Sequence, residues 1–197
     1  MISMKKLYFC LFLLAGIQPA MAQTAAQKQR ISEVREAYQQ ALHQIEMDKE
    51  QPEYTDNSLH LTMNRMVPGI GMTHTLVDMF IRNCGDEERI EQDWHPYFIR
   101  EKYNVAARQF VTEFLVNAEN GHGVFIFSRR PDDEEVSEYR IYFNADGSFC
   151  YATQTVLDNQ DNRTVNRVDA GHETVKELTQ AFRSLYGWGI STLNHDY

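Results

Sequence analysis

The chain has 197 residues, of which 43% are hydrophobic, and its 28 acidic residues outnumber the 19 basic ones. This length predicts one domain, which is large enough to fold without a metal ion or a disulfide. The acidic balance disfavours nucleic acid as a partner, because a phosphate backbone requires clustered Lys and Arg. We therefore expect no cofactor, no metal and no nucleic-acid partner.

Residues 1–22 have the organisation of a secretory signal peptide. Lys5 and Lys6 precede an apolar run over 7–17, and Ala20 and Ala22 occupy the positions that a signal peptidase reads. The run is well short of the roughly 20 residues of a transmembrane helix. A buried N-terminal helix is the alternative. We expect cleavage after Ala22 and an exported protein, periplasmic or extracellular, with no integral membrane segment left.

The remaining residues, 23–197, are predicted to form a single domain with 17 basic and 28 acidic residues, a net charge of −11. Two cysteines remain in it, Cys84 and Cys150. An oxidising compartment permits a disulfide between them. Two separate, semi-buried thiols are the alternative, because sequence alone provides no distance.

Two amphipathic helices are predicted, over residues 24–50 and about 170–186, because apolar residues recur there at steps of three and four. The two stripes are Ile31, Val34, Tyr38, Leu42 and Ile45, and Val175, Leu178, Phe182 and Leu185. Asp169 is the candidate cap of the second helix, and Gly187 is expected to end it. The tail from Trp188 onwards has no periodicity.

Between the helices the apolar period changes to two, which predicts strands. Seven are expected, over 58–66, 72–82, 97–103, 109–117, 124–128, 137–144 and 148–156. A helix competes around Ala106 and Ala107, but the β-branched and bulky residues beside them favour strands. The segment 83–96 is predicted to be a polar connection, and the Asp- and Asn-rich segment 157–168 a loop.

The first hairpin has a preferred register, with Val67 opposite Gly71. It collects apolar residues on one face, whereas a slip of one residue scatters them. The apolar pairs are Leu59–Met79, Leu61–Val77 and Met63–Thr75. The pairs on the other face are His60–Asp78 and Asn64–His74.

The last hairpin is predicted to turn at residues 145–147, where Gly147 suits a type I turn with a bulge. Asn144 then pairs with Ser148. The expected consequences are the pairs Phe143–Phe149 and Ile141–Tyr151, and a position for Cys150 on the other face beside Tyr142 and Arg140.

These elements predict an α+β fold, a single antiparallel β-meander of about seven strands packed by an N-terminal and a C-terminal helix. We expect both helices to cover the apolar face and the opposite face to be wet. Function would then lie on the wet face and in the loops.

The sequence lacks the common catalytic motifs. It contains no Gly-x-Ser-x-Gly elbow, no Gly-rich phosphate loop, no His-Glu-x-x-His and no pair of Cys-x-x-Cys motifs. Motif-bearing hydrolases, nucleotide enzymes and zinc ribbons are thereby excluded. Enzymes whose residues converge only in space are not.

Two groups of residues are candidates for a site. His60 and Asp78, with His74 nearby, would suit a general base oriented by a carboxylate; a solvated polar face is the alternative. Trp94 and His95 lie in the polar connection and would suit binding of a sugar or aromatic ring. Alternatively, Trp94 closes one end of the core.

The leader, the single N-terminal helix and two motifs together resemble a known type of chain. The motifs are Arg-Met-Val-Pro-Gly-Ile-Gly at 65–71 and Tyr-x-x-Tyr-Phe-Asn-x-Asp-Gly-Ser-Phe at 139–149. The chain is similar to the small exported proteins of unknown function common in Bacteroides-type bacteria. The resemblance implies export and one sheet-rich domain, and it implies no catalytic residue.

Three functions are consistent with these features. The first is an exported, non-enzymatic binding or interaction module for a small molecule, glycan or protein. The second is a hydrolase or lyase that uses His60 and Asp78. The third is an inhibitor or scaffold that acts through its hairpin tips.

Overall fold

The computed structural model describes residues 23–50, 57–69, 71–85, 93–160 and 162–194. The predicted signal peptide lies outside these residues. The strands are β1 (Ser58–Val67), β2 (Gly71–Asn83), β3 (Trp94–Val105), β4 (Arg108–Val116), β5 (Gly123–Pro131), β6 (Glu135–Phe143), β7 (Phe149–Asp158) and β8 (Arg163–Val168). Helix α2 (Ala25–Glu50) precedes them and helix α4 (Glu173–Leu193) follows them.

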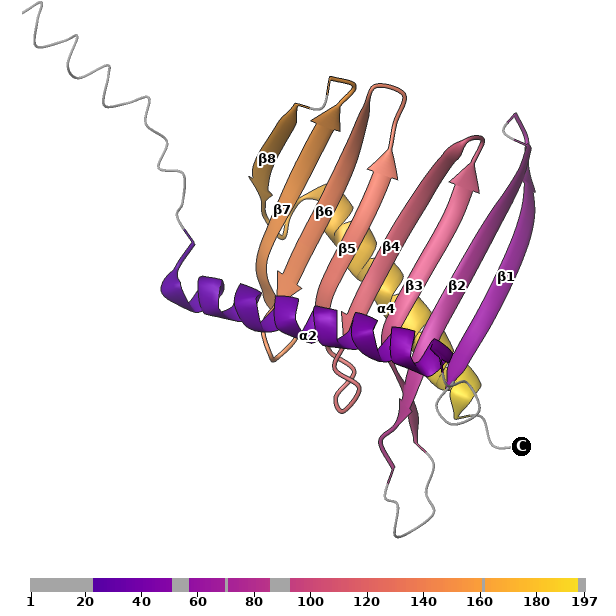
Figure 1. The fold of residues 1–197 in the computed structure, drawn as a ribbon, viewed down its shortest axis with the longest axis vertical. Coiled ribbons are helices and arrows are strands. Elements are labelled where there is room, and N and C mark those ends of the chain that lie inside the picture. The colour runs from indigo at the N-terminus through magenta and orange to yellow at the C-terminus, as the bar shows by residue number, and fades with distance from the viewer. Residues whose placement is uncertain (1–22, 51–56, 70, 86–92, 161, 195–197) are drawn as a thin grey trace, which may run out of the picture.

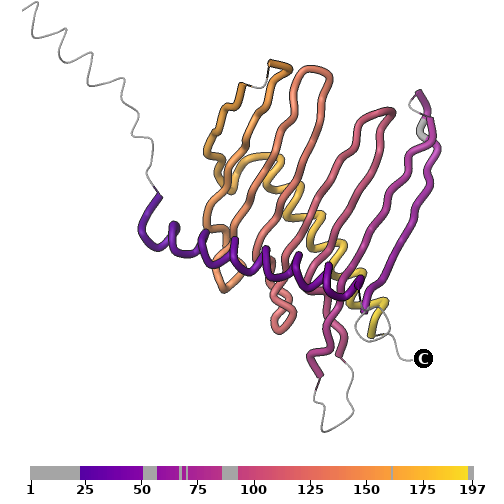
Figure 2. Tube along the Cα trace, in the orientation of Figure 1, coloured from indigo at the N-terminus to yellow at the C-terminus, as the bar shows by residue number. Residues whose placement is uncertain are grey.

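The strands form one antiparallel sheet in chain order, from β1 at one edge to β8 at the other (Figure 2). The predicted α+β meander with a helix at each end is therefore confirmed, with eight strands rather than about seven. The strands around Ala106 are also confirmed. Ala106 has a φ of 53°, so the chain reverses there in a tight turn instead of continuing as a helix.

Helices α2 and α4 lie on opposite faces of the sheet, α2 in front and α4 behind in Figure 1. The expectation that both cover one face is wrong. The α2 face buries Val34, Ile45 and Phe98 in one core. The α4 face buries Ile99, Leu178 and Phe182 in another. Both faces thus pack apolar side chains, and each helix leaves part of its face open.

The predicted loop 157–168 contains strand β8, which sequence reasoning missed. Five of the six β8 residues are exposed, so the apolar alternation of a half-buried strand is absent. The strand is held by backbone pairing with β7, in which Val165 lies opposite Thr155.

Helix α4 continues past Gly187 to Leu193, so the predicted end at Gly187 is wrong. Asp169 does not cap it either, because His172 occupies the N-cap position and Asp169 accepts a hydrogen bond from the Gly171 N–H. The last turns of α4 pack closely on β2. A Cβ at Gly189 would lie 2.7 Å from Met79 Sδ, so this glycine permits the approach.

The first hairpin has the predicted register, from Leu59 opposite Met79 to Val67 opposite Gly71. In the last hairpin, Phe143 lies opposite Phe149 as predicted, but Ile141 lies opposite Ala152 and not Tyr151. A bulge causes the difference, because Cys150 is an extra residue between two successive pairs. Cys150 does lie on the α2 face with Tyr142, as expected.

Candidate functional site

One row of directly opposed residues crosses the sheet on the α2 face. From β1 to β8 it contains His60, Asp78, Arg100, Glu113, Phe127, Arg140, Thr153 and Arg167. Opposed side chains on one face of a sheet are close neighbours. In the first half of the row, Arg100 lies between the two carboxylates Asp78 and Glu113, and His60 lies beyond Asp78. The second half is aromatic and basic.

The predicted pairs of the first hairpin are formed. His60 Nδ1 lies 2.8 Å from Asp78 Oδ1, and the His60 side chain is 59% exposed. His74 Nδ1 lies 2.6 Å from Asn64 Oδ1, so His74 bonds a different partner and does not join the His60–Asp78 pair. A catalytic role for these residues stays a prediction.

The middle of the row contains a buried carboxylate, Glu113. Arg100 Nε donates a hydrogen bond of 2.7 Å to Glu113 Oε1. The Tyr38 hydroxyl of helix α2 donates to Glu113 Oε2. Burial, reinforced by this hydrogen bond and the negative charge of Glu113, raises the pKa of Tyr38 well above its ordinary value, so the phenol remains a donor.

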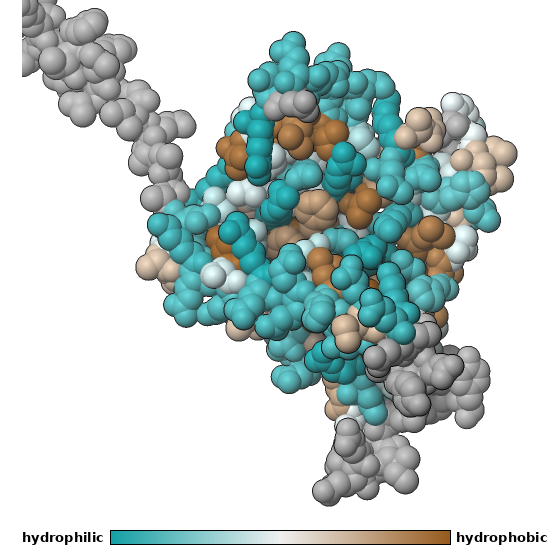
Figure 3. Space-filling view, in the orientation of Figure 1, coloured by the Kyte–Doolittle hydropathy of each residue, from teal (hydrophilic) through white to brown (hydrophobic). Residues whose placement is uncertain are grey.

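A cleft of about 550 Å³ lies between α2 and strands β5, β6 and β8. We call it the Arg35 cleft. Its aromatic lining is Tyr38, Phe125, Phe127 and Tyr142, and its basic lining is Arg35, Arg140 and Arg163. Figure 3 views this face and shows apolar atoms (brown and tan) surrounded by hydrophilic ones (teal).

The three arginines of the Arg35 cleft differ in whether they interact with other groups of the protein. The Arg140 guanidinium lies 5.3 Å from the centre of the Phe127 ring and pairs with Glu138 at 3.0 Å. Arg35 and Arg163 are exposed and have no ion pair or hydrogen bond within the described part of the chain. The cleft therefore has two uncommitted positive charges in a chain whose net charge is −9.

A larger cavity of about 770 Å³ is lined by the other side of α2 together with Arg82, Cys84, Tyr97 and Glu119. Burial raises the pKa of Tyr97 to about 12, so its phenol is neutral. Its hydroxyl has no hydrogen-bond partner among the described residues. The lining of this cavity contains one arginine and one carboxylate, so it lacks the excess of positive charge found in the Arg35 cleft.

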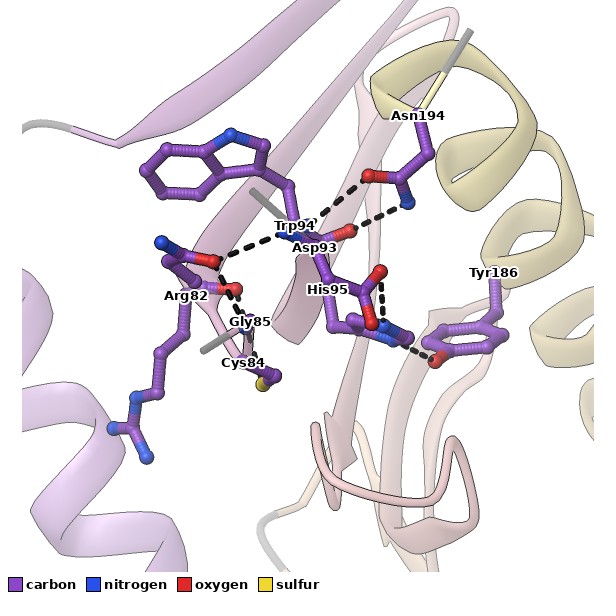
Figure 4. A network of polar contacts seen from close by, with 9 residues as sticks. Arg82, Cys84, Gly85, Asp93, Trp94, His95, Tyr186 and Asn194 are labelled. Carbon is purple, nitrogen blue, oxygen red and sulfur yellow. Dashed lines mark hydrogen bonds and ion pairs between the residues drawn. The ribbon is translucent and has the colours of Figure 1, made fainter. Parts of the chain in front are cut away.

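Trp94 and His95 are the first two residues of β3, so their predicted position in a polar connection is wrong. They take part in a network that joins β3 to α4, shown in Figure 4. The Asn194 side chain accepts a hydrogen bond from the Trp94 N–H and donates one to the Trp94 carbonyl. His95 Nε2 lies 2.9 Å from Asp93 Oδ1, and His95 Nδ1 lies 3.0 Å from the Tyr186 hydroxyl. Both nitrogens of His95 are engaged within the protein. Ligand binding by Trp94 and His95 stays a prediction.

The two cysteines are free thiols, so the alternative of two separate thiols holds. Cys84 is exposed at the end of β2, and Cys150 is buried in the core under α2. Burial raises the pKa of the Cys150 thiol, and partial desolvation raises that of the Cys84 thiol. Neither is therefore activated as a nucleophile at neutral pH.

The sequence does not predict the Arg35 cleft, although it does indicate the positions of two of its arginines. Arg140 was placed beside Tyr142, and Arg35 lies off the apolar stripe of its helix. Arg163, however, lay in a segment predicted to be a loop, so nothing placed it near the other two. Within the described ranges, no group of three or more His, Cys, Asp or Glu side chains is arranged to hold a metal ion.

Comparison with known proteins identifies no relative: no family model, no curated protein and no solved structure matches the chain. Of the helices in the described residues, none has the length and apolar character needed to cross a membrane.

Proposed function

We propose that the protein is an exported binding protein whose ligand carries an acidic group on an apolar, planar body. The ligand occupies the Arg35 cleft. The observation that carries the proposal is the pair of uncommitted guanidinium groups, Arg35 and Arg163, above an aromatic lining. A guanidinium group pairs with a carboxylate, sulfonate or phosphate through two parallel hydrogen bonds, and an aromatic wall packs against a flat apolar body.

Selectivity comes from contact with the cleft and not from the charge of the whole chain. Without the predicted signal peptide the protein has a net charge of −11 and repels anions at long range. At physiological ionic strength that repulsion is screened beyond about 8 Å, so contact with the arginines decides whether an anion binds. Simple ions lack the apolar body that fills the cleft. The favoured ligand therefore combines both features.

The test uses two fluorescent probes that differ mainly in charge. 8-Anilinonaphthalene-1-sulfonate has a sulfonate and an aromatic body, and N-phenyl-1-naphthylamine has nearly the same body without the sulfonate. We expect the sulfonate to bind more tightly to the folded protein, with an affinity that falls as salt is added. Circular dichroism under the same conditions confirms that the protein is folded.

Variants assign the binding to the cleft. The double variant Arg35→Gln/Arg163→Gln should weaken sulfonate binding by about tenfold or more and leave the neutral probe nearly unchanged. The control, Arg65→Gln, removes one positive charge from an exposed position on β1 and should have little effect. Equal binding of the sulfonate to the wild type and to the double variant would contradict the proposal.

Export belongs to the same proposal and rests on the organisation of residues 1–22. Its test is the intact mass of the protein recovered from expressing cells. Cleavage after Ala22 supports export. Recovery of only the full-length chain from a bacterial cytoplasm would contradict it.

A further inference from the structure

Ser58, the first residue of β1, completes a hydrogen-bonded chain with the His60–Asp78 pair. Residues two apart on a strand point to the same face, so Ser58 and His60 are neighbours. Ser58 Oγ lies 2.8 Å from His60 Nε2. His60 Nδ1 lies 2.8 Å from Asp78 Oδ1. One imidazole therefore bonds a hydroxyl through one nitrogen and a carboxylate through the other.

The order of these contacts determines the chemistry. An ionised carboxylate only accepts hydrogen bonds, so in neutral His60 the proton resides on Nδ1 and is donated to Asp78. Nε2 is then unprotonated and accepts the hydroxyl proton of Ser58. This is the arrangement by which a serine is activated in unrelated hydrolase folds, where geometry and not chain position identifies the group.

We propose that Ser58 is an acyl-accepting nucleophile and that this edge of the sheet hydrolyses carboxylic esters. Ser58 Oγ attacks the acyl carbon while its proton moves to His60 Nε2, and His60 then gives that proton to the departing alcohol oxygen. A water molecule attacks the resulting Ser58 ester and passes one proton through His60 back to Ser58 Oγ. The products are a carboxylic acid and an alcohol, and the protein is regenerated. Asp78 is a positioning residue that holds the imidazole in the required tautomer.

The position of the group indicates the substrate class. β1 is the edge strand of the sheet, and the His60 side chain is 59% exposed. Charges at such a solvent-exposed site are strongly screened, so the activation of Ser58 is modest. It is sufficient for hydrolysis of esters, which are more reactive than amides. Among the described residues no strand pairs with the outer side of β1, and such an edge also admits acyl groups carried on large molecules, which an enclosed pocket would reject.

The outer edge of β1 presents a backbone N–H to a substrate bound there. The Ile81 N–H donates a hydrogen bond to the Asn57 carbonyl. The backbone N–H and C=O groups of the odd-numbered residues along β1 therefore point toward β2. Pairing groups alternate along an antiparallel strand, so the His60 N–H faces the outer side of β1. A backbone N–H beside the attacked carbonyl stabilises the negative oxygen.

The experiment is covalent labelling of the full chain with a fluorophosphonate, which reacts with activated serines, followed by intact mass and peptide mapping. Hydrolysis of p-nitrophenyl acetate provides the rate. We expect one adduct, on Ser58. Ser58→Ala should abolish it, and His60→Gln and Asp78→Asn should slow labelling by about tenfold or more. The control, Ser184→Ala, removes an exposed serine of α4 and should leave labelling unchanged.

The outcomes separate this activity from ligand binding. Labelling should be unaffected in the Arg35→Gln/Arg163→Gln variant, because that cleft lies on other strands. Absence of any adduct on folded wild-type protein would overturn the proposal. So would labelling that persists at full rate in Ser58→Ala, since another residue would then be the nucleophile. Melting curves confirm that each variant is folded.

Discussion

At the scale of single residues, Glu113 defines how helix α2 meets the sheet. Its carboxylate is buried, and its two donors come from different elements, Arg100 from β3 and Tyr38 from α2. A buried charge is tolerated only when it is paired and hydrogen-bonded. The helix must therefore dock where Tyr38 reaches Glu113.

Arg100→Gln should destabilise the protein by about 3 kcal/mol, because it leaves a buried carboxylate without its charged partner. The control is Arg65→Gln, the same change at an exposed strand position, which should cost less than about 0.5 kcal/mol. Urea unfolding of both variants measures the difference. Equal stabilities would mean that the Arg100–Glu113 pair is solvated.

Glu101, on the α4 face of β3, makes stability depend on pH. Burial raises its pKa, and nearby Arg130 opposes the shift in part. A carboxyl group with a raised pKa in the folded state binds its proton more tightly there than in the unfolded chain. Its contribution to stability is therefore full below the ordinary pKa of glutamate and is lost as the pH rises through that value toward the raised one.

Glu101→Gln should accordingly stabilise the protein near pH 7, and the gain should shrink as the pH falls to about 4. Urea unfolding of the variant and the wild type at the two pH values checks the sign. Glu134→Gln, at an exposed loop position, is the control and should show no such trend. A gain that grows on acidification would contradict the assignment.

At the scale of elements, the end of α4 shows how the low helix propensity of glycine can mislead a prediction. Gly187 reads as a helix terminator, yet α4 continues through it and through Gly189. Gly189 allows the helix to contact Met79 and Pro96, and this packing offsets the low helix propensity of glycine. The network of Asn194 with Trp94 then holds the end of the helix.

Alanine at the two glycines should have opposite effects. Gly189→Ala should destabilise by about 1–3 kcal/mol, because the added methyl group would overlap the fully buried side chain of Met79. Gly187→Ala meets nothing within 4 Å and should stabilise by about 0.5–1 kcal/mol through helix propensity. Thermal unfolding compares them. Stabilisation by both would show that α4 does not pack closely at Gly189.

At the scale of the whole molecule, the sheet separates two cores. Ile45 belongs to the core under α2, and Leu178 to the core under α4. Mutations at distant sites with no shared partners add in free energy. Each helix should therefore contribute to stability independently of the other.

Ile45→Val and Leu178→Ala should be additive within about 0.5 kcal/mol in a double-mutant cycle. The comparison is Phe114→Leu with Phe182→Leu, whose rings lie 5.9 Å apart in one core and should couple by about 0.5 kcal/mol or more. Denaturant unfolding of the single and double variants supplies the energies. Strong coupling between Ile45 and Leu178 would contradict the separation of the cores.

Local patterns determined much of this protein. The period-two alternation and the Pro-Gly turn together pair His60 with Asp78: a slip of one residue would move Leu59 and Leu61 to the other face, and the turn at Val67 and Gly71 sets the remaining choice. The helical stripes identified both helices by the same logic of spacing. The spacing of apolar residues indicates which side chains are buried, and that information is enough to predict the register of this hairpin and the presence of the two helices.

Tertiary structure decided the rest. An apolar stripe packs equally well on either face of a sheet, so the sequence could not assign α2 and α4 to opposite sides. Phe98 and Ile99 are consecutive in β3 and point to opposite faces, and both are buried because both faces are covered. In the sequence alone, two consecutive apolar residues are equally well explained by their preference for strands. The polar strand β8 exists only because β7 offers it backbone partners. The Arg35 cleft needs α2, β5, β6 and β8 together, and only the folded chain brings their side chains into one place.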